Sequence, residues 1–228
     1  MSDQARSVTE AMLSRRSVRA FTPQPVSGEC IRRLLTAAAR APSGGNLQPW
    51  QLFVVGGAEL VRLKGIMRER VQQAPRGDAP EYTVYPEELV APYRDYRFQL
   101  GEDLYAELGI PREDKAGRLA WFAQNYQFFD APLALFCYVD RRMGPPQWSD
   151  LGMFLQSLML LLREEGLHSC AQECWSLYHR TLAEFLAPPA ELMLFAGMSI
   201  GYEDTRAAAN RLRSRRAPLD DFAQFRGI

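Results

Sequence analysis

The chain has 228 residues, of which 47% are hydrophobic and 24% are charged, and its formal net charge is zero. This length and composition are typical of a globular protein with a full core, and nothing resembles a linker, so we expect a single domain over residues 1–228. A chain without net charge is not expected to bind nucleic acid or membrane surfaces.

The first part of the chain alternates helix, turn and strand signals. A short amphipathic helix is expected over residues 8–13, and Ser27 is a suitable N-cap for a second helix with apolar residues at helical spacing. That helix should end at the breaker cluster of residues 42–45, before a strand over residues 50–55. A further helix is expected over residues 58–72.

The middle of the chain begins with a segment, residues 73–95, that is rich in proline, tyrosine and acidic groups and has no period. We interpret it as an excursion over the surface and as a candidate lid. Helices are expected over residues 97–108 and 113–129. The apolar run at residues 132–139 predicts a buried strand.

The last part contains a strongly apolar helix, expected over residues 150–165 and ended by Gly166. Its apolar residues surround most of the helix, which predicts burial in the core or across a subunit interface. A short strand (169–173), a helix (181–186) and a buried strand (192–201) follow. Because helices and strands are interleaved, the fold class is α/β or α+β.

Two groups of arginines stand near opposite ends of the chain. Arg15, Arg16 and Arg19 flank Ser17, and the second group comprises Arg211, Arg213, Arg215 and Arg216. The guanidinium fork suits phosphate, and a serine adds a hydroxyl. Two interpretations of the arginines stay open: both groups close around one doubly charged phosphate, or each group is a solvated basic patch.

The segment A-P-S-G-G-N-L-Q-P-W, residues 41–50, joins the second helix to the first strand. Its small residues would let a flat ligand approach the backbone, and the side chains of Ser43, Asn46 and Gln48 suit the polar edge of a heterocycle. The alternative is an ordinary turn from helix to strand, which Pro-Ser-Gly-Gly makes unaided.

Several familiar signatures are absent from the sequence. No G-x-G-x-x-G follows a strand, and there is no Walker loop or G-x-S-x-G elbow, which argues against a Rossmann dehydrogenase, an NTPase and an α/β-hydrolase. A cluster of histidines and cysteines lacks the spacing of common zinc sites, so we expect structural thiols and no metal there. Its members are His168, Cys170, Cys174 and His179.

The sequence favours a reduced protein in the cytoplasm. Its four cysteines are too few and too scattered for a disulfide framework, and the N-terminal stretch MSDQARSVTE has no apolar signal region. The longest apolar stretch, residues 151–162, is too short to span a bilayer.

Taken in order, these segments resemble a known family. R-R-S-V-R-A-F followed by A-A-R-A-P-S-G-G-N-L-Q-P-W-Q-L-F-V-V is similar to the N-terminal signature of the FMN-dependent nitroreductases. The similarity continues through N-Y-Q-F-F-D-A-P, G-L-H-S-C-A-Q-E, G-M-S-I-G-Y and N-R-L-R-S-R-R-A-P-L-D-D-F, and so covers nearly the whole chain. The segments Y-P-E-E-L and P-Y-R-D-Y-R make it most similar to the branch that contains 4-nitrobenzoate reductases.

This resemblance implies an α+β fold, a three-layer sandwich with a central mixed β-sheet flanked by helices, in an intertwined homodimer with FMN in its interface. In that dimer the loop of residues 42–48 would cover the flavin from the partner subunit, with Gln48 as a weaker candidate. Arg215 is an alternative contact in the tail. Matched by position, the FMN-binding residues are Arg15, Arg16, Ser17, Arg19, Pro42, Ser43, Asn46, Gln48, Gln172, Arg213 and Arg216.

Many members of this family place a glutamate–glycine pair near the flavin N5 atom. The corresponding stretch here is Ala171-Gln172-Glu173-Cys174, which departs from that pattern. The resemblance therefore points to Gln172, and then to Glu173, as the contact of N5. Because the flavin itself performs the redox chemistry, no catalytic acid or base is expected.

The activity that the resemblance implies is reduction of nitroaromatic compounds, and of quinones, with NAD(P)H as hydride donor in ping-pong order. The aromatic residues at 82–98 would form a substrate wall or lid, or else surface packing. A dehalogenase or flavin-fragmenting enzyme of the same fold is one alternative, and a flavin-binding protein without turnover is another. Arg16→Ala is expected to weaken FMN retention more than it lowers the melting temperature of flavin-free protein.

Overall fold

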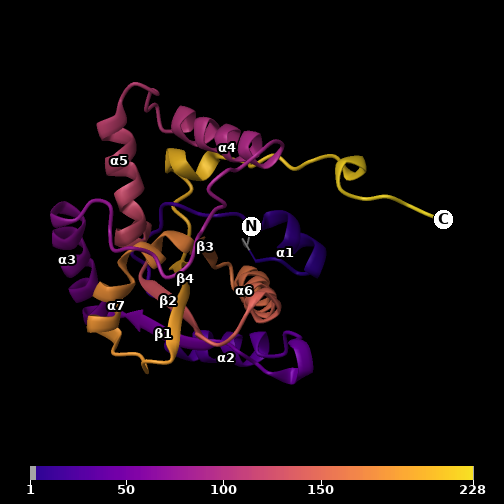
Figure 1. The fold of residues 1–228 in the computed structure, drawn as a ribbon, viewed down its shortest axis with the longest axis horizontal. Coiled ribbons are helices and arrows are strands. Elements are labelled where there is room, and N and C mark those ends of the chain that lie inside the picture. The colour runs from indigo at the N-terminus through magenta and orange to yellow at the C-terminus, as the bar shows by residue number, and fades with distance from the viewer. Residues whose placement is uncertain (1–3, 228) are drawn as a thin grey trace.

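A four-stranded sheet forms the centre of the protein, in a computed structural model that describes residues 4–227 (Figure 1). The strands lie in the order β1-β2-β4-β3. Their bounds are Gln51–Gly56 for β1, Leu133–Asp140 for β2, Leu192–Gly201 for β4 and His168–Gln172 for β3. Helices cover both faces of the sheet, which confirms the expected α+β sandwich of three layers.

All neighbouring strands of this sheet pair antiparallel. The expected mixed sheet is therefore corrected: within residues 4–227, parallel pairing is limited to an isolated bridge between Ser17 and Ser169. β2 and β3 do run in the same direction, as strands joined by a helical crossover do, here through α6 (Pro145–Glu164). However, β4 lies between them and runs the opposite way, so no two adjacent strands are parallel.

One face of the sheet is covered by α6 and by α2 (Gly28–Ala38). Ser27 caps α2 as expected, because its Oγ accepts a hydrogen bond of 3.4 Å from the backbone N–H of Cys30. α6 begins before its expected start, at Pro145, where Gln147 Oε1 accepts from the N–H of Gly144 at 3.2 Å. The core on this face includes Ile31, Leu34, Leu135, Cys137, Leu151, Phe154 and Leu158.

The opposite face is covered by α3 (Gly57–Gln73) and α7 (His179–Leu186), together with two 3₁₀ segments, Gln124–Asp130 and Glu173–Tyr178. Successive side chains of β2 point to opposite faces, so the strand contributes to both cores and is buried along most of its length. On this face the core includes Leu60, Leu63, Phe128, Phe136, Tyr138, Trp175 and Leu182.

Two further helices, α4 (Tyr93–Glu107) and α5 (Lys115–Ala123), stand at one end of the sheet (Figure 1). The expected helix over residues 113–129 is too long, because α5 ends at Ala123 and the next segment has left-handed backbone at Phe128 and Phe129 (φ 54° and 52°). This conformation turns both rings into the core, where Phe128 stacks on Trp175 with ring centroids 4.6 Å apart. Core packing thus overrides the helical pattern.

α1 (Val8–Ser14) and the C-terminal tail lie on the same side of the molecule as α6 (Figure 1). α1 packs beside α6, whereas the chain after the 3₁₀ turn Ala208–Arg211 leaves the body as an extended tail. The tail exposes Leu219, Phe222 and Phe225. None of the helices within residues 4–227 is long and apolar enough to cross a membrane.

Gly197 in β4 is required for the packing of Trp175. A Cβ atom at position 197 would lie 2.3 Å from Trp175 Cδ1, and the Trp175 side chain is fully buried among aromatic rings. Gly197→Ala is therefore expected to destabilise the protein by about 2 kcal/mol, which denaturant unfolding would measure. Gly152→Ala, where a new Cβ meets nothing within 4 Å, is the matched control and should not reduce stability. Equal stability of the two variants would contradict this account.

Candidate functional site

The structure brings arginines from the two ends of the chain together. Arg15 follows α1 directly, and Arg216 lies in the C-terminal tail. Partial burial lowers the pKa of Arg15, and the positive charge of Arg216 lowers it further. Two guanidinium groups whose positive charges repel each other favour an anion near them.

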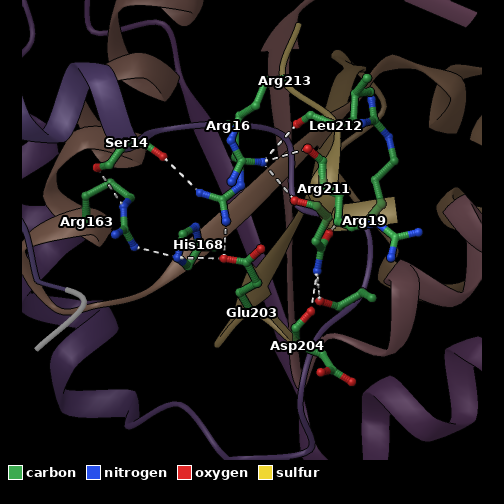
Figure 2. A network of polar contacts seen from close by, with 12 residues as sticks. Ser14, Arg16, Arg19, Arg163, His168, Glu203, Asp204, Arg211, Leu212 and Arg213 are labelled. Atoms are coloured by element: carbon green, nitrogen blue, oxygen red, sulfur yellow. Dashed lines mark hydrogen bonds and ion pairs between the residues drawn. The ribbon is translucent and has the colours of Figure 1, made fainter. Parts of the chain in front are cut away.

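Arg16 points into a buried polar network (Figure 2). Its Nη2 donates to Oε2 of Glu203, whose side chain is only 5% exposed, and its Nη1 donates to the carbonyl oxygen of Ser14 at 3.4 Å. The Nε of Arg16 is buried and has no hydrogen-bond partner among residues 4–227. Arg16 is thus held in place by its ion pair with Glu203, and its Nε carries an N–H donor that has no acceptor in the described chain.

Glu203 in turn lies against a second buried pair, Arg163 and His168 (Figure 2). His168 Nε2 is 3.5 Å from Glu203 Oε2 and 2.8 Å from Arg163 Nη1. An arginine only donates, so this histidine nitrogen is the acceptor of that hydrogen bond. Arg163 also donates to Ser14 Oγ at 3.1 Å. Sequence reasoning missed the role of Glu203, because the residue sits just after β4 and far from Arg16 in the chain.

Ser17 and Arg19, which follow Arg16 in the chain, make contacts of their own with β3 and with the start of the tail. Ser17 pairs with Ser169 of β3, which places the first arginine group beside that strand. The backbone N–H of Arg19 donates to Asn210 Oδ1 at 2.7 Å, and Asn210 is held by the carbonyl oxygens of Ala20 and Asp204. Asn210 therefore ties the segment after α1 to the start of the C-terminal tail, a contact that the sequence did not predict.

A cavity of about 530 Å³ lies next to Arg19. Its floor is the end of β3 and the following turn, and its walls come from the segment before α4, from α4 itself and from α5. This volume lies in the range of small-molecule sites. The lining residues include Arg19, Tyr85, Arg97, Tyr105, Trp121, Phe122, Asn125, Phe129, Ala171, Gln172, Glu173 and Leu177.

The side chain of Gln172 is engaged in the protein interior. Its Nε2 donates to the carbonyl oxygen and to Oδ1 of Asn125, at 2.8 and 3.2 Å, and its Oε1 accepts from Ser199 Oγ at 2.7 Å. The residue is 2% exposed, although it contributes to the cavity floor. Gln172 would therefore contact a bound ring through its backbone, because its side-chain amide is already hydrogen-bonded within the protein.

Glu173, the second candidate on the cavity floor, is placed differently from Gln172. Its side chain remains accessible at the cavity, and partial burial there raises the pKa of its carboxyl group. Ala171, on the preceding position of β3, is also exposed to the cavity. The stretch from Ala171 to Glu173 thus offers its backbone and one acidic side chain to a ligand.

The remaining arginines of the tail do not converge on Arg15 in this structure. Arg213 donates to carbonyl oxygens of its own segment, including that of Asn210 at 2.8 Å (Figure 2). Arg211 pairs with Glu107 at 3.1 Å, and Arg215 Nε lies 3.7 Å from Asp103. The tail is therefore attached to α4. Arg216 donates to Ser214 Oγ at 2.8 Å and to the carbonyl oxygen of Arg215 at 2.9 Å, and its positive charge lowers the pKa of Arg15.

The loop after α2 carries Pro42, Ser43, Asn46 and Gln48 and lies apart from the cavity. No residue of this loop lines the cavity within the described chain. Its shape is nevertheless defined: Asn46 and Gln48 have left-handed backbone (φ 57° and 49°), and buried Asp150 accepts from the N–H of Gly44 at 3.3 Å. Most of this loop is exposed to solvent in the single chain.

The histidines and cysteines singled out in the sequence are distributed over different environments. Across residues 4–227, no three side chains of His, Cys, Asp or Glu are grouped so that they could hold a metal ion. Cys170 and Cys174 are free thiols, and burial raises the pKa of both. His179 lies at a distance from this pair, with Nε2 3.0 Å from the carbonyl oxygen of Ala79.

Known proteins resemble this chain over nearly its whole length. The family model described as the nitroreductase family matches residues 12–202. A nitrobenzene nitroreductase from Ectopseudomonas oleovorans is 36% identical, covering 96% of each chain, and a 4-nitrobenzoate reductase from Pseudomonas putida is 34% identical, covering 94% of this chain and 93% of that one.

Solved structures agree with these relatives. The FMN- and NADPH-dependent nitroreductase NfnB from sphigopyxis sp. strain HMH superimposes with a TM-score of 0.94 at 48% identity, covering 97% of this chain and 100% of that one. NfnB from Mycobacterium smegmatis, solved in complex with NADPH, gives a TM-score of 0.90 at 30% identity, covering 96% and 97%. With this fold and a family match over most of its length, the chain belongs to the nitroreductase family.

Proposed function

We propose that the protein is an FMN-dependent oxidoreductase that uses NAD(P)H to reduce nitroaromatic compounds. The observation that carries this proposal is that the segment after α1, with Arg15 and Arg19, runs beside β3, whose end forms the floor of a cavity with aromatic walls. An anion site next to a flat apolar cavity suits a phosphorylated flavin. The full-length resemblance to nitrobenzene and 4-nitrobenzoate reductases supports the same assignment.

We assign the FMN phosphate to the arginines near the two ends of the chain. Arg15 and Arg216 would form charge-assisted hydrogen bonds with it, and the buried Nε of Arg16 supplies a donor that has no acceptor in the described chain. Ser17 and Arg19 follow Arg16 in the chain, and Arg19 lines the cavity, so they would meet the ribityl chain and the edge of the ring. Arg213 would complete the phosphate contacts only after release from its own carbonyl contacts.

A second copy of the chain would complete the site. The loop of Pro42, Ser43, Asn46 and Gln48 is ordered and exposed, but it lies apart from the cavity of its own chain. Apolar side chains are also exposed on α1, where Val8, Met12 and Leu13 are 74%, 51% and 84% accessible, and on the tail. Their burial against a partner would stabilise a homodimer in which the loop covers the flavin of the other subunit.

When bound, FMN accepts two electrons as hydride from NAD(P)H and passes them to the acceptor. The chain's own contribution is to orient the two co-substrates and to exclude water. Trp121, Phe122 and Phe129 would pack against flat rings in the cavity, and the backbone at Gln172 would contact the reactive edge of the flavin. One aromatic cavity serves the donor and the acceptor in turn, which favours ping-pong order.

Each cycle of this reaction delivers two electrons and two protons. They convert an aromatic nitro group to a nitroso group and water, and two electrons with two protons likewise convert a quinone to a hydroquinone. Quinones are therefore part of the proposal.

A cytoplasmic location is also part of the proposal, since all four cysteines are free thiols. The relatives that match over nearly the full length are nitroreductases, which favours this activity over dehalogenation or flavin fragmentation.

An absorbance experiment tests the proposed function. Purified protein loaded with FMN is expected to show a flavin spectrum, to bleach within minutes of anaerobic NAD(P)H addition, and to regain colour when 4-nitrobenzoate or nitrobenzene is added. Separate titrations with NADH and NADPH would give the preferred donor. Bound flavin that does not bleach would indicate a flavin-binding protein without turnover. Protein that binds no FMN would exclude every flavin-dependent activity.

A further inference from the structure

Arg97 differs from the other arginines around the cavity. It lies on α4, on the same helix face as Leu104 and Tyr105, and all three line the cavity. Within residues 4–227 no carboxylate lies within ion-pair distance of Arg97. By contrast Arg118, also beside this wall, stacks on the Tyr105 ring but is neutralised by Glu102 at 2.7 Å. Arg97 therefore brings an uncompensated positive charge to the cavity wall.

The Arg97 guanidinium stacks on the Tyr85 ring, and this contact uses none of the hydrogen-bond donors of Arg97. The guanidinium carbon of Arg97 lies 4.3 Å from the centre of that ring. Such stacking occupies the flat face of the group, whereas its N–H donors lie in the plane of the group and stay available. A planar fork held in this way matches the two oxygens of a carboxylate.

The charges around the cavity favour an anion. Its charged lining residues are Arg19, Arg97 and Glu173. The excess is therefore positive even when Glu173 is ionised, and the burial that raises the pKa of Glu173 favours its neutral form. The other walls are aromatic, from Trp121, Phe122 and Phe129, and suit a flat ring.

We propose that Arg97 is a specificity-determining residue that selects aromatic acceptors bearing a carboxylate, such as a nitrobenzoate, over uncharged nitroarenes. The inference rests on the function proposed above. The carboxylate would accept from the Arg97 fork while the aromatic ring lies between the aromatic walls, with its nitro group toward the cavity floor at Gln172. Relatives that act on nitrobenzene and on 4-nitrobenzoate match the chain almost equally well, so overall similarity does not select between the two acceptor classes.

A pair of acceptors of equal size tests this inference. Steady-state kinetics at saturating reductant would compare 4-nitrobenzoate with 4-nitrobenzamide, which replaces the carboxylate by a neutral amide. The wild-type enzyme is expected to have a lower KM for 4-nitrobenzoate, by about tenfold or more, as one charge-assisted hydrogen-bonding group provides. The amide withdraws electrons from the ring more strongly, so intrinsic reactivity works against this result. An equal or higher KM for 4-nitrobenzoate would overturn the inference without any variant.

The variant Arg97→Gln is expected to raise KM for 4-nitrobenzoate at least tenfold and to change KM for 4-nitrobenzamide less than twofold. Arg112→Gln is the matched control, because Arg112 is also exposed and stacks on an aromatic ring, at 5.1 Å from the centre of Phe98, but does not line the cavity. FMN content and melting temperature would show that both variants are folded. A KM for 4-nitrobenzoate that does not change in Arg97→Gln would overturn the assignment.

The same experiment tests the alternative that Arg97 binds the phosphates of the reductant and not the carboxylate of the acceptor. If Arg97→Gln raises KM for NADPH and leaves KM for 4-nitrobenzoate unchanged, the residue recognises the pyridine nucleotide, and the proposal for the acceptor is wrong. If neither nitroarene is reduced by wild-type enzyme whose flavin is bleached by NAD(P)H, the proposed function itself fails. Turnover of both acceptors at equal efficiency would refute only the role of Arg97.

Discussion

Simultaneous replacement of Arg15 and Arg216 by alanine is expected to weaken FMN binding by about two to four orders of magnitude. Each arginine would provide a charge-assisted contact to the phosphate worth about 1.5–3 kcal/mol, and about 1.4 kcal/mol corresponds to a factor of ten. Single replacements should each cause part of this loss, with some coupling because both groups would share one phosphate. Titration of flavin-free protein with FMN, followed by flavin fluorescence, measures the dissociation constants.

Riboflavin makes the test specific for phosphate. The wild-type protein should bind FMN far more tightly than riboflavin, and the Arg15→Ala/Arg216→Ala variant should lose most of this difference. Arg211→Ala is the control, because Arg211 belongs to the same tail group but pairs with Glu107. An unchanged preference for FMN over riboflavin in the double variant would place the phosphate elsewhere.

The flavin-free double variant should also keep its stability. In the free protein, burial lowers the pKa of Arg15, and repulsion by the charge of Arg216 lowers it further. Removal of one or both charges relieves this repulsion, so the melting temperature of flavin-free protein is expected to stay constant or rise. A residue pair that opposes folding but favours a ligand is typical of a binding site. A fall in melting temperature of the flavin-free variant would instead give these arginines a structural role.

Arg16→Ala is expected to destabilise flavin-free protein by about 3 kcal/mol, the lower end of the range for breaking a buried ion pair. Arg16 and Glu203 form such a pair, with side chains 23% and 5% exposed. The variant would leave the Glu203 carboxylate buried without its partner. For a chain of this size the melting temperature should fall by about 6–12 °C. This result would revise the sequence-based expectation that Arg16 matters chiefly for FMN retention.

A double-mutant cycle identifies the cause of this loss. Arg16→Met/Glu203→Met removes both charges, and it should recover a large part of the stability that either single replacement loses, since neither member of the pair is left buried without the other. Measurements on flavin-free protein avoid stabilisation by bound FMN. If Arg16→Ala melts within about 2 °C of wild type, or if the losses of the single variants simply add, the pair does not hold the structure together.

Most secondary structure followed from local sequence patterns, whereas the errors arose where distant residues intervene. The strand expected over residues 192–201 is β4 as predicted, and Ser27 caps α2 as expected. The helix expected over residues 113–129 failed because the rings of Phe128 and Phe129 enter a core made by Trp175 and Phe136, which no local window contains. The mixed sheet failed because strand order depends on where β4 inserts.

The sequence likewise predicted some features of the candidate site and not others. The sequence alone predicted that Arg15 and Arg216 could bind a phosphate, because the guanidinium group suits phosphate in any protein. The sequence did not show which arginines act together: Arg16 pairs with Glu203, whereas the charge of Arg216 acts on Arg15. The amide of Gln172 looked available in the sequence, but its hydrogen bonds to Asn125 and Ser199 occupy it.

The sequence by itself determined the family, the alternation of helices and strands, and the chemical types present at the site, because these depend on residue identity and on neighbours along the chain. Only the tertiary structure decided the partners of each charged group, since Arg16 and Glu203 lie 187 residues apart and meet through the packing of β4 against the segment after α1. It also decided that the loop of residues 42–48 lies apart from the cavity, and that Arg97 brings a free charge to the cavity wall. Charge pairing and cavity shape follow from distances in space, which local sequence does not specify.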